Sequence, residues 1–275
     1  MHHLTSRLTV ATLLLCVFAQ SAAAQLFTLP KKPRLTGMYL QWGYNRGVYS
    51  RSDLHFANGN NYNFTLHQAR AKDQPDYQAF FSHPLQITIP QNSYRIGFWM
   101  NPERTWAIEI NYDHAKYVVP DNQNLRISGQ IHGEPLDRDT IVRRNFVHME
   151  HTDGANFYHI NYVRQQPLWQ GPRHIRTTLL TKVGAGLVVP RSYVILMGNK
   201  LDNKFHVAGY IVSAELGSRI YLGRSLHLEA AVKGGFANYL NALTVEGGRM
   251  HHHFWYGAAV GTLGYDIPFR KGAFH

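Results

Sequence analysis

RTWAIEINYDHAKYVV, residues 104–119, alternates between apolar and polar side chains. Trp106, Ile108 and Ile110 hold even positions, whereas Glu109 and Asn111 hold the odd positions between them. Successive side chains of a β-strand point to opposite faces of a sheet. The stretch therefore predicts a strand with one apolar face and one polar face.

The same two-residue period recurs along the chain and indicates an all-β protein. No Ser/Gly linker, repeat or low-complexity tract divides residues 35–269, so we expect a single domain there. A hairpin signal at Asp153-Gly154 splits residues 140–165 into two strands, which gives about ten strands, with eight or twelve as alternatives. The expected strands lie within residues 35–45, 61–71, 92–101, 104–119, 140–151, 156–165, 174–189, 205–222, 225–236 and 253–269.

Strands of this kind suit two architectures. A soluble sandwich or barrel buries its apolar faces inside, whereas a membrane barrel turns them outward to lipid around a polar lumen. The expected segments run for about 10 to 18 residues, which exceeds the usual strand of about 5 to 6 residues. That length suits a tilted membrane crossing of about 9 to 11 residues. We therefore expect a closed antiparallel transmembrane β-barrel with a polar lumen.

The N-terminus has the three parts of a secretory signal peptide. Arg7 precedes an apolar or small run from Leu8 to Ala19, and residues 22–24 offer an Ala-x-Ala cleavage site. The run is shorter than the roughly 20 residues that a membrane-spanning helix needs. Cleavage after Ala24 removes the only cysteine, Cys16, and leaves 27 Lys and Arg (28 minus Arg7) against 17 Asp and Glu, a formal charge of +10.

The last expected strand ends in a pattern that outer-membrane barrels share. TLGYDIPF, residues 262–269, has a polar residue, then a glycine, then alternate hydrophobic residues that end in an aromatic one. This resembles the assembly signal that the barrel-insertion machinery recognises. The chain departs from the usual pattern because it continues with RKGAFH, residues 270–275. The expected signal residues are Thr262, Gly264, Tyr265, Ile267 and Phe269.

Residues 35–269 as a whole resemble an uncharacterised outer-membrane β-barrel family of Gram-negative bacteria, of the Bacteroidota type. The resemblance is carried by WGYNRGVYSRSDLHF (42–56), LQITIPQNSYRIGF (85–98), INYDHAKYV (110–118) and EHTDGANFYHINY (150–162). It implies a barrel exported to the outer membrane, with periplasmic chaperones and the barrel-insertion machinery as partners, and it brings no activity. The chain then divides into a signal peptide (1–24), a periplasmic N-terminal segment (25–34), the barrel (35–269) and a C-terminal tail (270–275).

Charged side chains on the polar faces are expected to pair across neighbouring strands. If Gly223-Arg224-Ser225 forms a three-residue loop, Arg219 lies opposite Glu229 and Glu215 lies opposite Lys233. Opposite charges directly across strands contribute about 0.2 to 1 kcal/mol per pair. A one-residue slip would turn them to lipid, where Arg or Lys costs about 2 to 4 kcal/mol at the midplane. We therefore expect ion pairs to fill the lumen side of this hairpin.

A second hairpin leads to the same expectation. With Asn101-Pro102-Glu103 as its loop, Arg95 falls opposite Glu109 on the polar face. Charges on further strands extend the network if those strands face the same lumen, and the network then plugs the barrel. The expected lumen network is Arg95, Glu109, Asp113, Arg176, Lys182, Glu215, Arg219, Glu229 and Lys233.

The basic composition points to anionic partners at the membrane surface. Lipopolysaccharide and the headgroups of other outer-membrane lipids suit basic pairs such as Lys31-Lys32, Arg143-Arg144 and Arg270-Lys271. A solvated surface that keeps the exported chain soluble is the simpler interpretation of the same residues. No Lys/Arg run exceeds two residues, and export excludes nucleic acid as a partner.

Two functions fit this scaffold. One is a non-enzymatic barrel that serves as a structural protein, an adhesin, or a narrow or plugged pore. The other is an outer-membrane lipid-modifying hydrolase or acyltransferase, which needs a serine, a histidine and an acid close together. Ser213 and His227 share a face, but the expected register puts Ser213 opposite Gly235, roughly 25 Å along the strand from His227. That pair cannot form, so we expect the non-enzymatic function.

Histidines suggest a metal site, but their spacing argues against one. Neighbouring side chains of a strand point to opposite faces, so His251-His252-His253 cannot hold one ion within a strand. No HExxH or EF-hand spacing occurs, and we expect neither a metal nor a cofactor. The densest polar cluster, at the expected Asp153-Gly154 hairpin, is His148, Glu150, His151, Asp153 and His159.

Overall fold

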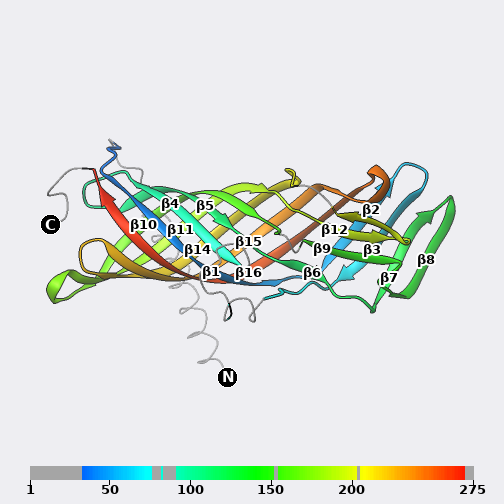
Figure 1. Ribbon diagram of the computed structural model, residues 1–275, viewed down its shortest axis with the longest axis horizontal. Coiled ribbons are helices and arrows are strands. Elements are labelled where there is room, and N and C mark those ends of the chain that lie inside the picture. The colour runs from blue at the N-terminus through cyan, green and yellow to red at the C-terminus, as the bar shows by residue number, and fades with distance from the viewer. Residues whose placement is uncertain (1–32, 76–81, 83–90, 152–153, 203–204, 270–275) are drawn as a thin grey trace, which may run out of the picture. The chain divides into compact units, whose positions relative to one another are not determined.

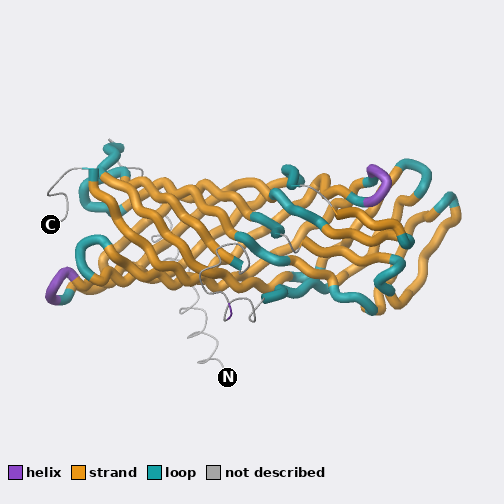
Figure 2. The backbone as a smooth tube through the Cα atoms, viewed as in Figure 1, coloured by secondary structure: helices purple, strands orange, loops and turns teal. Residues whose placement is uncertain are grey.

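The computed structural model describes residues 33–75, 82, 91–151, 154–202 and 205–269 (Figure 1). The expected signal peptide, most of the segment 25–34, Asp153 and the C-terminal tail lie outside these residues. Within them, strands make up most of the chain, and two short 3-10 helices accompany them (Figure 2). No helix in the described ranges is long and apolar enough to cross a membrane.

The described part of the chain contains sixteen strands and the helices η1 (Pro172–His174) and η2 (Val245–Gly247). The strands are β1 (Gly37–Tyr49), β2 (Ser52–Asn58), β3 (Tyr62–Ala69), β4 (Asn92–Trp99), β5 (Trp106–Asp113), β6 (Tyr117–Val119), β7 (Gln123–Ile131), β8 (Glu134–Val142), β9 (Val147–His151), β10 (Phe157–Gln170), β11 (Ile175–Val188), β12 (Tyr193–Leu196), β13 (Asn199–Asp202), β14 (Gly209–Leu222), β15 (Leu226–Leu243) and β16 (Arg249–Pro268).

Eight of these strands pair in a ring. Their order is β1-β4-β5-β10-β11-β14-β15-β16, and β16 pairs again with β1, so that each strand is hydrogen-bonded to two others. All of these pairings are antiparallel. Two of the ten stretches expected as strands, 61–71 and 140–151, lie outside the ring, in β3 and in β8 and β9.

The connections between ring strands differ at the two ends of the ring. One end has the turns from β4 to β5, β10 to β11 and β14 to β15, and the first residues of β1 pair there with the last residues of β16. The other end has the long connections from β1 to β4, β5 to β10 and β11 to β14, which carry all the remaining strands (Figure 1). The long connections from β1 to β4, β5 to β10 and β11 to β14 therefore all lie at the end of the ring opposite the turns.

The remaining strands build a second region at the end with the long connections. Strands β2, β3, β7 and β8 extend the sheet outward from β16, and β13-β12-β9-β6 form a separate sheet. The two groups share one core, in which Phe56, Phe64, Tyr117, Met149 and Val194 are buried. We call this second region the outer platform.

The expected hairpin at Asp153-Gly154 does not form. Strand β9 pairs with β6 and β12, whereas β10 pairs with β5 and β11. The reason is burial, because Val147 and Met149 of β9 are buried in the core that the outer platform shares, where β9 lies between β6 and β12. The backbone N–H of Ala155 instead donates to the carbonyl of Ala115 (2.7 Å), where the chain returns to the ring.

The alternation of the C-terminal strand is as the sequence predicts. Thr262 and Gly264 of β16 point inward and are buried, whereas Tyr265 and Ile267 point outward with 53% and 36% of their surfaces exposed. Phe269, directly after the strand, is 48% exposed.

The two hairpins that carry the expected ion pairs differ in register. Between β14 and β15, Arg219 lies opposite Glu229 and Glu215 lies opposite Lys233, as the sequence predicts. Between β4 and β5 the prediction is wrong by two residues, since Arg95 lies opposite Asn111 and not opposite Glu109. A two-residue shift keeps every side chain on its face.

The turn between β4 and β5 explains the shift. Asn101 Oδ1 accepts hydrogen bonds from the backbone N–H groups of Thr105 (3.0 Å) and Trp106 (3.3 Å). The N–H of Met100 donates to the carbonyl of Trp106 (3.1 Å), so residues 101–105 form the turn. An Asx-type side-chain bond of this sort stabilises a longer loop than the expected 101–103.

Gly97 lies between two residues that touch across it. It is opposite Tyr39 of β1 on one side and opposite Glu109 of β5 on the other. The Tyr39 ring lies over Gly97, and its hydroxyl donates to Glu109 Oε2 (2.6 Å). A Cβ at residue 97 would overlap the Tyr39 ring. Glycine at this position therefore permits the contact between Tyr39 and Glu109.

We predict that Gly97→Ala lowers the free energy of unfolding by about 1 to 3 kcal/mol, the usual cost of overpacking a filled interior. The measurement is urea-induced unfolding of the full chain in detergent, followed by tyrosine and tryptophan fluorescence. Gly261→Ala is the matched control, because a Cβ at Gly261 meets nothing within 4 Å. Equal stability of the two variants would contradict the packing of Tyr39 over Gly97.

Candidate functional site

The interior of the ring holds a layer of charged side chains that point inward from β4, β5, β11, β14 and β15. None of them exposes more than 5% of its surface. The layer balances four carboxylates against four cations, so its formal charge is zero. We call it the charge layer, and its members are Glu109, Asp113, Glu215 and Glu229 with Arg95, Lys182, Arg219 and Lys233.

Glu229 lies at the centre of the charge layer. Its Oε1 accepts hydrogen bonds from Arg95 Nη1 (2.9 Å) and Lys182 Nζ (2.7 Å). Its Oε2 accepts from Arg219 Nη2 (2.7 Å) and Nε (3.0 Å), and from Gln41 Nε2 (2.8 Å). The cross-strand neighbour Arg219 is thus one of three cations on this carboxylate, and the other two come from β4 and β11.

Arg95 and Lys182 connect Glu229 to two further carboxylates. The guanidinium of Arg95 donates to both oxygens of Glu215, at 2.7 and 3.0 Å. Lys182 Nζ lies 3.0 Å from Glu109 Oε2 and 3.3 Å from Glu215 Oε1. Arg95 Nη1 also lies 3.9 Å from Glu109 Oε1, so these two residues interact although they are not opposite each other. The five residues form one connected network.

Neutral side chains complete the hydrogen bonding of Glu109. Tyr39 donates to one of its oxygens, and Asn161 Nδ2 donates to the other (2.9 Å). Hydrogen bonds to an ionised group contribute about 1.5 to 3 kcal/mol each, roughly twice the value for neutral partners. Such bonds offset part of the cost of removing the carboxylate from water.

Lys233 pairs with a different carboxylate from the one that the register suggests. It is opposite Glu215, but its Nζ donates to Asp113 Oδ2 (2.5 Å) and to Asn111 Oδ1 (2.7 Å) of β5. Ser93 Oγ donates to the other oxygen of Asp113. The ion pair crosses the interior of the ring and does not follow one hairpin.

A second polar group, which the sequence analysis did not identify, lies nearer the turns. Asp266 accepts a hydrogen bond from Trp99 Nε1 (2.5 Å), its other oxygen is 3.0 Å from His227 Nδ1, and Arg104 Nη1 lies 3.8 Å away. The alternation of residues along β16 could have identified Asp266 from the sequence. Asp266 is four residues beyond Thr262 and therefore shares its inward face.

Arg176 does not join the carboxylates. Its guanidinium carbon lies 3.9 Å from the centre of the Tyr221 ring, an arginine–aromatic contact near the turn end of the ring. Arg176 is opposite Tyr221 in the register of β11 and β14. The tyrosine hydroxyl donates to Gln165 Oε1 (3.0 Å). The structure thus places Arg176 inside the ring but outside the charge layer.

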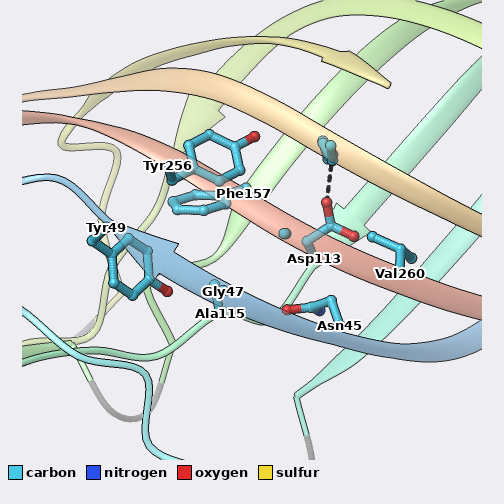
Figure 3. Close-up of a pocket in the computed structure, with 10 residues that line it drawn as sticks. Asn45, Gly47, Tyr49, Asp113, Ala115, Phe157, Tyr256 and Val260 are labelled. Atoms are coloured by element: carbon cyan, nitrogen blue, oxygen red, sulfur yellow. Dashed lines mark hydrogen bonds and ion pairs between the residues drawn. The ribbon is translucent and has the colours of Figure 1, made fainter. Parts of the chain in front are cut away.

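A small cavity lies where the charge layer meets the aromatic core (Figure 3). Tyr49, Phe157 and Tyr256 line it at one end, and Asn45 and Asp113 line it at the other. It has room for about one water molecule. This cavity therefore has no room for a larger ligand.

The polar cluster expected near residues 148–159 is dispersed. His148 Nδ1 lies 2.7 Å from Asp121 Oδ1 and its Nε2 lies 3.6 Å from Glu150 Oε2, both in the outer platform. Those carboxylates raise the pKa of His148 against the opposing effect of its burial. His159 lies inside the ring and makes no hydrogen bond to a described residue. Asp153 lies outside the described residues.

His151 belongs to a buried histidine pair. Its Nδ1 is 2.8 Å from Ser192 Oγ, and its Nε2 is 3.4 Å from His252 Nε2. Burial lowers the pKa of His151 from 6.5 to about 3. Ser192 and His151 form a serine–histidine pair, but the second ring nitrogen faces a histidine where a hydrolase triad has an acid. Among the described residues, no three His, Cys, Asp or Glu side chains are grouped to hold a metal ion.

No protein-family model and no curated protein matches this chain. Solved structures match at low identity. Outer membrane protein OprG from Pseudomonas aeruginosa is 11% identical, with a TM-score of 0.39 over 86% of this chain and 98% of that one. Ail of Yersinia pestis is 8% identical (TM-score 0.33, 85% and 99%), and outer membrane protein AlkL is 11% identical (TM-score 0.35, 89% and 95%). The solved structures that this chain resembles are outer-membrane β-barrel proteins.

Proposed function

We propose that residues 35–269 form a closed eight-stranded β-barrel in the outer membrane, exported through a signal peptide that is cleaved after Ala24. The barrel is non-enzymatic, its lumen is plugged by the charge layer, and it holds the outer platform at the cell surface as a structural or adhesive element. The observation that carries the proposal is the outward face of the ring, which is apolar and bordered by aromatic residues.

The outward face is suited to lipid in composition and in height. Leu216, Leu228, Val232 and Leu263 are among its exposed apolar side chains. On β16, the outward positions from Trp255 to Ile267 span roughly 40 Å of strand at about 3.3 Å per residue. At a tilt of about 45°, that distance covers roughly 28 Å along the barrel axis, close to the apolar band of about 25 Å in outer-membrane barrels.

Aromatic residues border this band on both sides. On the side of the long connections, Tyr94, Tyr112 and Tyr158 lie directly opposite one another on β4, β5 and β10. Their ring centroids are 6.0 and 4.9 Å apart. On the side of the turns, Tyr265 and Phe269 are exposed. Aromatic side chains at both edges of the band suit the two membrane interfaces.

The charge layer favours a plugged barrel over an open pore. Its ion pairs join β4, β5, β11, β14 and β15 across the interior, at distances of 2.5 to 3.0 Å. A hydrophilic channel would instead need charged side chains with water around them. The core of the outer platform, at the end of the ring with the long connections, is rich in aromatic residues and adds a second obstruction to passage through the barrel.

An even number of strands puts both chain ends on the periplasmic side, and the long connections then lie outside the cell. In that orientation the outer platform meets lipopolysaccharide, which we propose as its lipid partner. Periplasmic chaperones and the barrel-insertion machinery are the proposed partners during assembly, through Thr262, Gly264, Tyr265, Ile267 and Phe269.

We predict that Phe269→Asp blocks insertion of the barrel without blocking export, because the terminal aromatic residue is part of the assembly pattern. Cell fractionation and heat-modifiable migration on gels are the measurements. Phe274→Asp, in the tail beyond the expected signal, is the control and leaves both unchanged. A Phe269→Asp protein that resists extraction and still migrates as a folded band would falsify the assignment of the signal.

We predict that the wild-type protein gives no stable large conductance in planar bilayers. A large conductance of the wild-type protein would rule out the plug.

We predict that Glu229→Gln destabilises the protein, because it removes the carboxylate on which Arg95, Lys182 and Arg219 converge. Leaving buried charges without their partner costs about 3 to 5 kcal/mol. Unfolding in urea measures that loss. Asp137→Asn, which removes an exposed ion pair with Arg126, is the control and leaves the stability nearly unchanged.

A further inference from the structure

Arg46 on β1 and Arg164 on β10 are charged residues on the outward faces of ring strands. Arg46 forms an ion pair with Asp73 (2.9 Å). Arg164 forms no ion pair with a described residue, and its Nε is buried without a hydrogen-bond partner among them. An arginine that faces lipid is unfavourable unless it has an anionic partner or reaches an interface.

Two further donors without partners lie beside Arg164. Trp106 is directly opposite it on β5, and Tyr162 precedes it by two residues on the same face of β10. The Trp106 and Tyr162 rings are 5.9 Å apart, and Trp106 is only 5% exposed. Neither the Trp106 indole N–H nor the Tyr162 hydroxyl has a hydrogen-bond partner among the described residues. Three polar groups with hydrogens to donate thus gather on one patch of the outward face.

The patch lies at the turn end of the ring. The backbone N–H of Gln165 donates to the carbonyl of Thr105 (2.8 Å), the last residue of the turn between β4 and β5. In the proposed orientation this is the boundary of the inner leaflet. A charge costs about 2 to 4 kcal/mol at the bilayer midplane but only about 0 to 1 kcal/mol near the interface. Arg164 is thus placed where headgroups lie.

Apolar side chains continue from the patch toward the middle of the band. Ile108 is opposite Tyr162, and Ile110 is opposite Ile160. Ile110 and Ile160 expose 51% and 64% of their surfaces. A ligand that satisfies both parts of this surface has an anion at one end and an acyl chain at the other.

We propose that Arg164, Trp106 and Tyr162 bind the phosphodiester of one inner-leaflet phospholipid, whose acyl chain lies along Ile108, Ile110 and Ile160. This inference rests on the proposed membrane barrel. The guanidinium supplies charge and paired donors to the phosphate oxygens. The indole N–H and the phenol hydroxyl supply one further donor each.

The test is retention of phosphatidylglycerol, measured by native mass spectrometry of the full chain released from phosphatidylglycerol nanodiscs. Arg164→Gln is expected to weaken retention about tenfold, which corresponds to about 1.4 kcal/mol. Trp106→Phe and Tyr162→Phe each delete one donor while keeping the ring, and each causes a smaller loss. Arg173→Gln, in η1 at the tip of the same hairpin, is the matched control and retains the lipid.

Each outcome decides a separate point. Failure of the wild-type chain to give a heat-modifiable folded band contradicts the membrane barrel itself. A folded wild-type protein that retains lipid no better than Arg164→Gln or Tyr162→Phe contradicts only the lipid site. Displacement of the bound lipid by inorganic phosphate would assign the patch to a free anion and overturn the phospholipid. If Arg164→Gln does not fold, the two phenylalanine variants still decide.

Discussion

The rest of the ring depends on the neutralisation of one buried carboxylate. Glu229 is held by Arg219 from the neighbouring strand and by Arg95 and Lys182 from strands further around the ring. Removing an ion from water costs several kcal/mol, which only well-placed counter-charges and hydrogen bonds offset. Strands that are distant in the sequence must therefore hold their positions together, because each supplies a charge that another requires.

The need to neutralise buried charges fixes the face of the strand on which a charged side chain lies. It fixes less strictly the residue with which that side chain pairs. A slip of one residue turns every inward charge outward, whereas a slip of two residues keeps each charge inside. The hairpin of β4 and β5 illustrates the difference, since Arg95 is two residues away from its expected position opposite Glu109. Both residues still reach the charge layer. Long side chains such as Arg95 and Lys182 find carboxylates across the interior when the directly opposite position offers none.

The sequence was informative wherever a property follows from local geometry. Alternation gave the eight ring strands and their faces, but not β2, β7, β12 and β13 of the outer platform. It also gave the tight hairpin of β14 and β15, because a three-residue loop leaves little freedom of register. It could not give the β4–β5 register, which depends on the side chain of Asn101 within the turn. Nor could it show that Val147–His151 joins a separate sheet, because the Asp153-Gly154 signal is local and the burial of Met149 is tertiary. Asp266 was missed although its position was predictable from the alternation.

The continuity of β16 has a mechanical consequence. This strand pairs with β15 and β1 in the ring and, at residues 249–251, with β2 of the outer platform. The platform is thus joined to the ring by an unbroken strand as well as by connecting loops. A pulling force on the platform would load β16 along its length, in shear against two neighbouring strands, where many hydrogen bonds resist together. Tension applied to the outer platform would therefore reach the ring as shear between strands. It would not separate the strands one hydrogen bond at a time.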